Sequence, residues 1–319
     1  MTFGLGIVSL ALAMLLGMVL DALLGEVRFA HPLVGFGRYA NWLEGKLNRG
    51  SARLFRGLLA WMSAVVPLVA LATALLYGAG KTLPLLVFTL HAVLLYFCLG
   101  LRSLRDHFLP IAEALQRDDL ATARSLTRRI VSRDTAHADA QDLSKATVES
   151  LLENGNDAVF GTLFWFLVAG GPGALLFRLA NTLDAMWGYR NARFLFFGRI
   201  AARVDDGLNW IPARLTACTY LLLGDSRTAW RCWRAQAPSW SSPNAGPVMA
   251  AGAGALQLAL GGAATYEGVL EIRPLLGSGC APGCDDIRRA WWLVSRSAAV
   301  WCCVMLVAAL IAVALEYHA

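Results

Sequence analysis

GLLAWMSAVVPLVALATALLYG, residues 57–78, decides the fold class, because it runs for 22 residues without a charged side chain. At about 1.5 Å of rise per residue, a helix of this length crosses a hydrocarbon core roughly 30 Å thick. Residues 4–20, 83–101 and 297–316 have the same character. We therefore expect about four firm transmembrane helices.

The composition of the whole chain agrees with this reading. Of 319 residues, 57% are hydrophobic and 16% are charged, and the mean hydropathy is +0.53, which is too apolar for an ordinary soluble domain. We predict an all-α polytopic membrane protein that forms a single domain over residues 1–319. The first apolar run lacks a charged leader region and a small-residue cleavage site, so we expect an anchor; a removable signal is the alternative.

The basic residues orient the expected helices. If the N-terminus lies outside, the segments 21–56 and 102–296 lie in the cytosol, and Lys81 stands alone on the outer side. Segment 21–56 holds six basic residues: Arg28, Arg38, Lys46, Arg49, Arg53 and Arg56. The net charge of +6 therefore reflects membrane topology. No basic stripe interleaved with aromatic residues indicates nucleic acid as a partner.

Residues 158–183 are apolar but contain Gly170-Gly171-Pro172-Gly173. A full span here would place Arg190, Arg193, Arg199 and Arg203 outside, against the charge bias. Because glycine and proline break helices, we predict a re-entrant or membrane-dipping helical hairpin.

Three shorter segments complete the expected architecture. Residues 211–223 and 248–263 are apolar but short, which favours packed helices. Residues 274–286 are rich in glycine and proline, which predicts a flexible connection before the last span. Cys280 and Cys284 lie in that connection at a CxxxC spacing, for which a metal site or a disulfide is the alternative. We expect reduced thiols, because the other five cysteines lie in apolar contexts and seven is an odd number.

The stretch 132–160, SRDTAHADAQDLSKATVESLLENGNDAVF, packs six carboxylates into this apolar chain. We expect Asp134 to cap a helix over about 135–153. The spacing then places Asp142, Glu149 and Glu153 on one helix face. A solvated face is the alternative on periodicity alone.

Further polar clusters follow downstream: NTLDAMWGYRN at 181–191, ARVDDGLNWIPARLTA at 202–217 and SSPNAG at 241–246. Acids beside arginines and asparagines suit a site for phosphate and magnesium, because carboxylates bind hard cations and guanidinium groups bind phosphate. Structural ion pairing is the alternative. GAGKT at 78–82 lacks the first glycine of a P-loop, and the histidines have no metal-ligand spacing.

Several motifs carry a resemblance in register: HPLVGFGR, SRDTAHAD, ATVESLLEN, NTLDAMWGYR, DDGLNWIPARLTA, SPNAG and GGAATYEG. Over about residues 17–300 the chain resembles the adenosylcobinamide-phosphate synthase (CobD/CbiB) family of cobalamin biosynthesis. The resemblance implies a ligase of the bacterial inner membrane, with its active site facing the cytosol. Such an enzyme uses ATP and Mg²⁺ to join adenosylcobyric acid, a cobalt-carrying corrinoid, to (R)-1-aminopropan-2-ol or its O-phosphate.

The matched motifs supply the candidate positions, and chemistry suggests their roles. We assign Asp205 and Asp206 to Mg²⁺, and we assign Glu149 to the amine, whose proton it would accept. The other candidate catalytic residues are Glu153, Asp134 and Asp184. The candidate substrate- and phosphate-binding residues are Ser132, Arg133, Asn154, Asn181, Tyr189, Arg190, Asn209, Arg214, Ser242 and Asn244.

Two other classes of protein stay open. A membrane transporter explains the helices, although its acids should lie inside spans and not in long polar segments. A noncatalytic membrane signalling protein of the related AmpE type would share the architecture without needing every polar motif. Besides the two substrates and membrane lipid, the resemblance leaves a second copy of the chain or other cobalamin-pathway enzymes open as partners.

Overall fold

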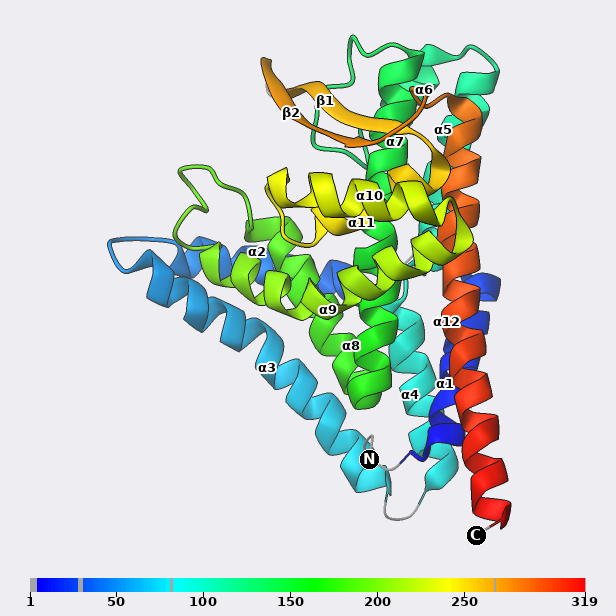
Figure 1. The fold of residues 1–319 in the computed structure, drawn as a ribbon. Coiled ribbons are helices and arrows are strands. Elements are labelled where there is room, and N and C mark those ends of the chain that lie inside the picture. Colours follow the sequence, from blue (N-terminus) through cyan, green and yellow to red (C-terminus); the bar gives the residue numbers. More distant parts are fainter. Residues whose placement is uncertain (1–4, 28–30, 81–82, 267, 319) are drawn as a thin grey trace. The chain divides into compact units, whose positions relative to one another are not determined.

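The computed structural model (Figure 1) describes residues 5–27, 31–80, 83–266 and 268–318. The chain divides into two compact units. Unit 1 comprises Met1–Gly100, Gly161–Asn209 and Cys302–Ala319, and unit 2 comprises Leu101–Phe160 and Trp210–Trp301. We predicted one domain over 1–319. Two of the four boundaries of this division, at 209/210 and 301/302, fall inside continuous helices.

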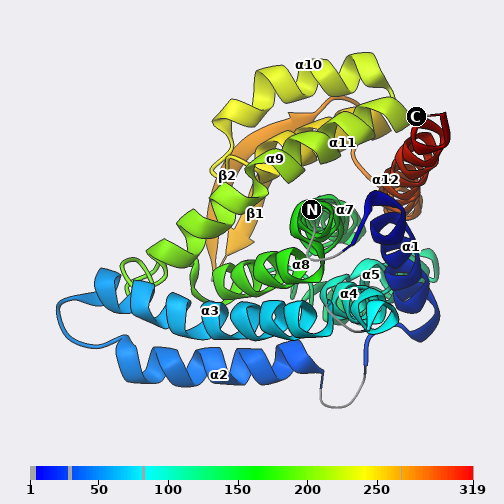
Figure 2. The same cartoon turned by 90° about the horizontal axis from the view of Figure 1, so that it is seen from below.

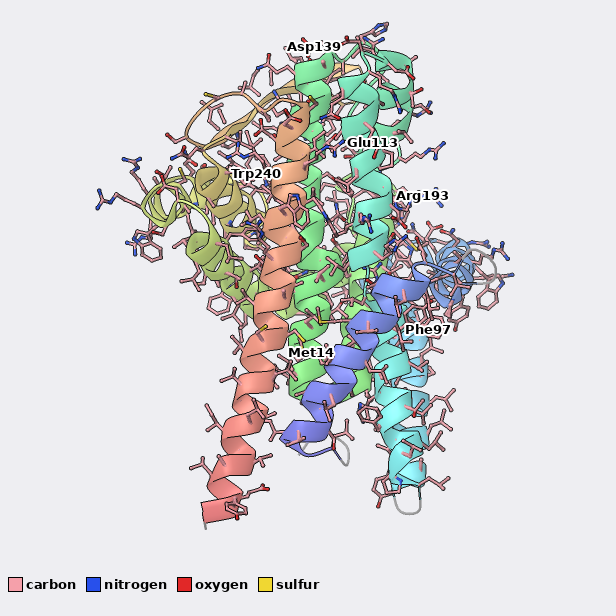
Figure 3. The ribbon with its side chains drawn as sticks, turned by 90° about the vertical axis from the view of Figure 1, so that its right-hand side faces the viewer. Met14, Phe97, Glu113, Asp139, Arg193 and Trp240 are labelled. Carbon is pink, nitrogen blue, oxygen red and sulfur yellow. The ribbon has the colours of Figure 1, made fainter. Side chains whose placement is uncertain are left out.

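Unit 1 is helical. It contains α1 (Ile7–Leu24), α2 (Pro32–Leu47), α3 (Arg53–Gly80), α4 (Pro84–Cys98) and α8 (Gly161–Trp187), with the start of α9 (Arg199–Leu223) and the end of α12 (Cys284–His318). Helix α1 packs along α4 and buries Met14 completely (Figure 3). The apolar sequences that predicted spans thus form helices that also pack on one another.

Five segments of the described chain are long and apolar enough to cross a membrane: Ile7–Leu24, Arg53–Gly80, Pro84–Gln116, Ala140–Trp187 and Cys284–Tyr317. The prediction of an all-α, multi-pass membrane protein is therefore confirmed, and each of the four expected spans coincides with one of these segments. The fifth contains the stretch for which we predicted a hairpin. Arg28 and Lys81, which we used for orientation, lie outside the described residues.

The predicted break inside 158–183 is confirmed. Within α8, Ala169 and Gly170 leave the helical conformation, and Gly170 has φ of 61°. Two close approaches show that the chain reverses there: a Cβ on Gly161 would lie 2.1 Å from the ring of Phe177, and one on Gly173 would lie 2.2 Å from the carbonyl of Trp165. The two arms of α8 are therefore antiparallel neighbours, as in a helical hairpin.

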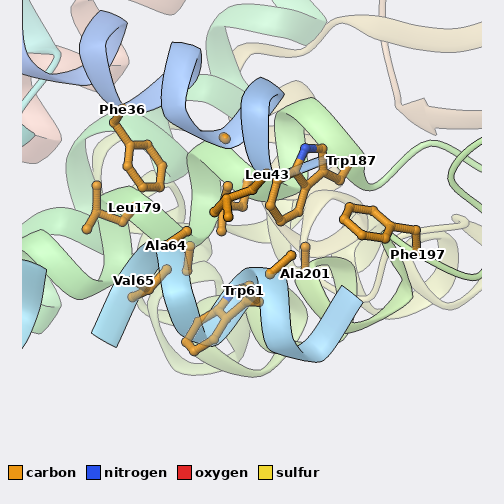
Figure 4. Packing of buried hydrophobic residues seen from close by; sticks show 13 residues of the cluster. Phe36, Leu43, Trp61, Ala64, Val65, Leu179, Trp187, Phe197 and Ala201 are labelled. Atoms are coloured by element: carbon orange, nitrogen blue, oxygen red, sulfur yellow. The ribbon is translucent and has the colours of Figure 1, made fainter. Parts of the chain in front are cut away.

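The main apolar core of unit 1 lies where α2, α3, α8 and the start of α9 meet (Figure 4). Trp187 and Phe197 form an edge-on aromatic pair there, with ring centroids 5.1 Å apart. Small residues such as Ala64 and Ala201 let the helices approach closely, as is usual between membrane helices. Leu183 and Trp187 belong both to this core and to the polar motif at 181–191, so the core holds that motif in place.

Unit 2 combines helices with one small sheet. Its helices are α5 (Leu101–Gln116), α6 (Leu120–Thr127), α7 (Ala140–Gly155), a π-helical turn (Asn156–Phe160), α10 (Ser226–Gln236), a 3₁₀ turn (Ala237–Ser239) and α11 (Ala245–Leu256), with parts of α9 and α12. Strands β1 (Ala259–Tyr266) and β2 (Val269–Gly277) form an antiparallel hairpin. Helices α10 and α11 run side by side, and both contact β2 (Figure 2).

The hairpin corrects two predictions. The expected helix over 248–263 ends at Leu256, because Gln257 is left-handed and the chain enters β1 two residues later. The expected flexible connection over 274–286 begins inside β2 and is reduced to the residues between β2 and α12. The seven cysteines are free thiols, as predicted.

The expected helix cap is also wrong. Asp139 caps α7, since its carboxylate accepts from the backbone N–H of Asp142 at 2.8 Å. Asp134 instead accepts from the N–H of Gly268 at 2.8 Å and donates its own N–H to the carbonyl of Thr265 at 2.8 Å. The hairpin therefore holds Asp134 in an extended loop, and the helix starts later than its first acidic residue suggests.

Candidate active site

A buried carboxylate held by two arginines lies inside unit 2. Glu149, on α7, is only 2% exposed. Arg273 donates from Nη1 to Oε2 at 2.9 Å and from Nη2 to Oε1 at 3.2 Å, and Arg133 forms a second ion pair with Oε2. The backbone N–H of Gly261 donates to Oε1 at 2.7 Å. These partners compensate for the hydration that the carboxylate loses on burial.

Three distant segments build this cluster, which we call the Glu149 cluster (Arg133, Glu149, Gly261 and Arg273). Arg133 lies in the loop before α7, and Arg273 lies on β2. A β-bulge at Gly261 and Gly262 shifts the strand register. Gly261 has φ of 75°, and a Cβ there would lie 2.1 Å from the carbonyl of Pro274. The extra residue of the bulge is Pro274 on β2, which has no partner in the strand ladder, and at this irregular point the Gly261 N–H donates to Glu149.

The Glu149 cluster forms part of the wall of a cavity of about 500 Å³ within unit 2. Five predicted site residues line this cavity together: Ser132, Arg133, Glu149, Glu153 and Asn154. The rest of the wall includes Trp240 and Ser241, which follow the 3₁₀ turn, and three residues of the hairpin, Tyr266, Glu271 and Arg273. The structure thus brings residues of the stretch 132–160 together with Tyr266 of the GGAATYEG motif.

The cavity carries charges of both signs. Its lining includes two arginines, Arg133 and Arg273, whose side chains are 12% and 13% exposed and which both pair with Glu149. Burial opposes the charge of Arg273, but the hydrogen bonds and charge of Glu149 raise its pKa above the usual range. Glu153 and Glu271 add carboxylates to the same cavity. Such a cavity suits a small ligand with an anionic and a cationic end.

A second cavity, of about 470 Å³, lies along the other side of the same loop in unit 2. It is lined by Arg133, Asp134, Asp142, Lys145 and the hairpin residue Thr265. Asp142 is exposed, whereas Glu149 is buried and Glu153 is half-buried. The three acids predicted to share one helix face therefore serve two different cavities.

Two further motifs meet at the start of α11. Arg214 donates from Nη1 to Oδ1 of Asn244 at 3.0 Å and from Nη2 to the carbonyl of Pro243 at 3.1 Å. The hydroxyl of Ser242 accepts hydrogen bonds from the backbone N–H groups of Asn244 and Ala245, which lie at the start of α11. These contacts place the predicted residues Arg214, Ser242 and Asn244 together. They also show that Arg214 and Ser242 are engaged in structural hydrogen bonds.

The remaining predicted acids belong to unit 1. Asp205 is 7% exposed and accepts from the amides of Asn181 at 3.3 Å and Asn209 at 3.0 Å. Burial raises the pKa of its neighbour Asp206, and Arg190 and Arg203 counteract this effect. Asp184 interacts electrostatically with both aspartates. Three predicted motif acids and two predicted asparagines therefore gather in one place.

No group of three His, Cys, Asp or Glu side chains within the described residues is arranged to hold a metal ion. Asp205 and Asp206 are also consecutive on α9, so their side chains leave the helix about 100° apart. Any cation at this carboxylate group would need ligands from a bound molecule in addition to the protein. Tyr189 and Arg190 are exposed in the turn after α8.

The sequence reading missed Arg273, Trp240 and Tyr266. Arg273 lies 5.6 Å from the centroid of the Trp240 ring, and both line the cavity of the Glu149 cluster. A signal for the hairpin was present, because a two-residue connection ending in Gly268 separates ATY from the strand-like VLEIR. Arg273 would then have been placed on the strand opposite Gly262.

The comparisons with known proteins identify the family of the chain. The family model described as CobD/Cbib protein matches residues 14–294. A cobalamin biosynthesis protein CobD from Stutzerimonas stutzeri is 56% identical over 300 residues, covering 93% of this chain and 97% of that protein. The corresponding proteins of Chromobacterium violaceum (94% of this chain, 97% of that protein) and Mycobacterium tuberculosis (93% and 96%) are 51% and 39% identical. No solved structure matches the chain. Because the family model and these relatives cover nearly the whole chain, the protein belongs to the CobD/CbiB family.

Proposed function

We propose that this protein is an ATP-dependent amide synthase of cobalamin biosynthesis. It joins the free carboxylate of adenosylcobyric acid to the amine of (R)-1-aminopropan-2-ol or its O-phosphate and so forms adenosylcobinamide or its phosphate. The membership in the CobD/CbiB family and the names of the relatives support the pathway. The observation that carries the reaction class is the Glu149 cluster, which holds two arginines at the wall of a polar cavity that also carries Glu153 and Glu271.

The chemistry requires a leaving group on the carboxylate. In one route the carboxylate oxygen attacks the γ-phosphorus of ATP, ADP leaves, and the amine then displaces phosphate from the acyl phosphate. In the other route an acyl adenylate forms, pyrophosphate leaves, and the amine displaces AMP. Both routes build negative charge on phosphoryl oxygens, and both release a proton from the attacking amine. In one cavity, arginines can stabilise the negative phosphoryl oxygens and a carboxylate can accept the proton.

The geometry changes the role that we assign to Glu149. Its four hydrogen bonds occupy the acceptor positions of both oxygens, which leaves it poorly placed to take a proton. We therefore assign Glu149 to positioning Arg133 and Arg273 as phosphate-binding groups. Glu153 is half-buried at the same cavity and is the better candidate to accept the proton of the amine. An aminopropanol phosphate would place its phosphate at the arginines and its ammonium at Glu153 or Glu271.

Mg²⁺ is proposed to bind at Asp205 and Asp206 in unit 1. Protein sites usually hold this ion through one or two carboxylates together with substrate phosphates and water. The cluster of Asp184, Asp205 and Asp206 fits that pattern, because it supplies carboxylates to a cation. Within the described residues no three such side chains are arranged to hold a metal ion by themselves. When bound, the ion would neutralise charge on the phosphates of ATP. Asn181 and Asn209 orient Asp205 through their amides.

The setting of the enzyme is also part of the proposal. We assign it to the bacterial inner membrane, with segments 21–56 and 102–296 in the cytosol, where ATP is available. Its partners would be the corrinoid, the amine and membrane lipid, with no nucleic acid. A transporter or an AmpE-type signalling protein would have no need of a buried carboxylate that organises two arginines at a cavity.

A direct assay tests the function. Purified protein in detergent receives adenosylcobyric acid, ATP, Mg²⁺ and either aminopropanol or its phosphate, and the amide product is quantified by chromatography. Release of ADP indicates the acyl phosphate route, and release of AMP indicates the adenylate route. Arg273→Gln should raise the KM for the phosphorylated amine by about tenfold or more, while Arg117→Gln, an exposed arginine of unit 2, should not. Absence of amide with both amines would refute the proposal.

A further inference from the structure

Helix α2 exposes a face that mixes aromatic, aliphatic and basic side chains. Val34, Arg38, Trp42 and Lys46 recur every four residues and are all exposed, with Val34 at 54% and Trp42 at 57%. Tyr39 stacks on Trp42 with ring centroids 5.9 Å apart. Trp, Tyr, Lys and Arg side chains concentrate where a helix lies along the membrane–water boundary.

The segment that contains α2 is strongly basic. Residues 31–56 hold five lysines and arginines and one acid, Glu44. Arg193 binds Glu44 through both oxygens, at 3.0 Å and 2.7 Å, so that acid does not offset the charge of the exposed basic residues. A surface of this composition is complementary to anionic lipid headgroups.

An apolar groove of about 520 Å³ lies in unit 1 between α2, α3, α4 and α8. Its wall includes Leu33 and Phe36 of α2, Leu71 and Leu75 of α3, and Leu94 of α4. Helix α2 runs along α3 (Figure 2), and Phe36 and Leu179 meet at the edge of the core below it (Figure 4). Since α3 and α4 are both candidate membrane spans, the groove would open toward lipid acyl chains.

We propose that the groove binds one acyl chain of an anionic phospholipid, whose phosphate lies beside Arg38. Gly35 and Tyr39 line the groove, and Arg38 follows Gly35 by three residues, which makes them neighbours on the helix. A soluble anion would not use the groove, and a neutral apolar ligand would not use the basic face. Only an amphiphile with a negative headgroup matches both features. The site is separate from the Glu149 cluster, which belongs to unit 2.

Native mass spectrometry of the detergent-solubilised full chain tests this proposal. The protein is incubated with phosphatidylglycerol or phosphatidylcholine of the same acyl composition, and retained lipid is counted. We expect one tightly retained phosphatidylglycerol and weaker retention of phosphatidylcholine. Arg38→Gln should reduce the preference for phosphatidylglycerol by about fivefold, and Arg38→Lys should keep it. Equal retention of the two lipids by the wild type would overturn the assignment of the headgroup.

Two matched glycine variants test the groove. A Cβ on Gly35 or on Gly45 of α2 meets no atom within 4 Å, so a larger side chain is tolerated at either position. Gly35 lines the groove and Gly45 does not. Gly35→Phe should therefore abolish retention of phosphatidylglycerol, and Gly45→Phe should preserve it. Unchanged retention in Gly35→Phe, or equal loss in both variants, would contradict binding in the groove.

Discussion

At the scale of single residues, the Glu149 cluster shows how one buried charge organises a site. The Glu149 carboxylate is the shared acceptor for Arg133, Arg273 and the N–H of Gly261. The two arginines come from segments 140 residues apart and would repel each other without the acid between them. The position of both guanidinium groups therefore depends on Glu149.

Replacing Glu149 with glutamine should lower turnover by roughly 100-fold, because a small displacement of binding groups has an effect of that size. The change should also destabilise the fold by about 3 kcal/mol, since it leaves two buried cations without their anion. Asp142→Asn is the matched control, because Asp142 lies exposed on the same helix. Amide formation and thermal melting in detergent would be measured for both. Loss of activity in Asp142→Asn alone would contradict this assignment.

A second buried acid, Glu44, should make the stability of the fold depend on pH. Hydrogen bonds from Arg193, and then from Asn48, hold the pKa of Glu44 below its usual range despite burial. Ionised Glu44 therefore stabilises the fold above its unfolded pKa, near 4.3, and this contribution is lost as pH falls through the lower folded value. Glu44→Gln should melt a few degrees lower at pH 7, and the difference from wild type should shrink below about pH 4. Glu113→Gln, at an exposed acid, should show no such trend (Figure 3).

At the scale of elements, the break at Ala169 and Gly170 makes α8 a hairpin and not one straight helix. Gly170 adopts a positive φ that only glycine takes without strain, and the N–H of the next residue donates to Nδ1 of His91 at 2.8 Å. A Cβ on Gly170 would lie 2.4 Å from the His91 ring. The turn is therefore restricted both by its own backbone conformation and by its contact with α4.

Gly170→Ala should destabilise the protein by about 2 kcal/mol, because it combines backbone strain with a steric clash. Gly78→Ala is the matched control, since Gly78 lies in helix α3 and a Cβ there meets no atom within 4 Å. Alanine favours a helix over glycine by about 1 kcal/mol, so this variant should be as stable as the wild type or more stable. Melting followed by size-exclusion chromatography in detergent would compare the two. Equal melting temperatures for wild type and Gly170→Ala would argue against a strained turn.

At the scale of the whole molecule, the distribution of basic residues predicts the orientation in the membrane. In a variant without the native cysteines, a cysteine at Arg199 should resist a membrane-impermeant maleimide in intact cells. A cysteine at Tyr317 should react, because both termini are expected outside and this side chain is 86% exposed. Both positions should react after the membrane is made permeable. Labelling at 199 in intact cells would reverse the proposed topology.

The sequence by itself determined the properties that depend on local composition. Apolar runs long enough to span a bilayer predicted the helices, and Gly170 to Gly173 predicted the break between them, because length and backbone freedom are local. The motifs also supplied the candidate site residues, and five of these line one cavity.

Only the tertiary structure decided which charges meet. Arg273 pairs with Glu149 across 124 residues, and a bulge in an unpredicted hairpin supplies the Gly261 N–H. Helix periodicity assigned Asp142 and Glu149 to one face. The loop and hairpin packed against α7 bury Glu149 and leave Asp142 exposed. Burial and pairing depend on segments distant in the chain, and a local pattern does not contain that information.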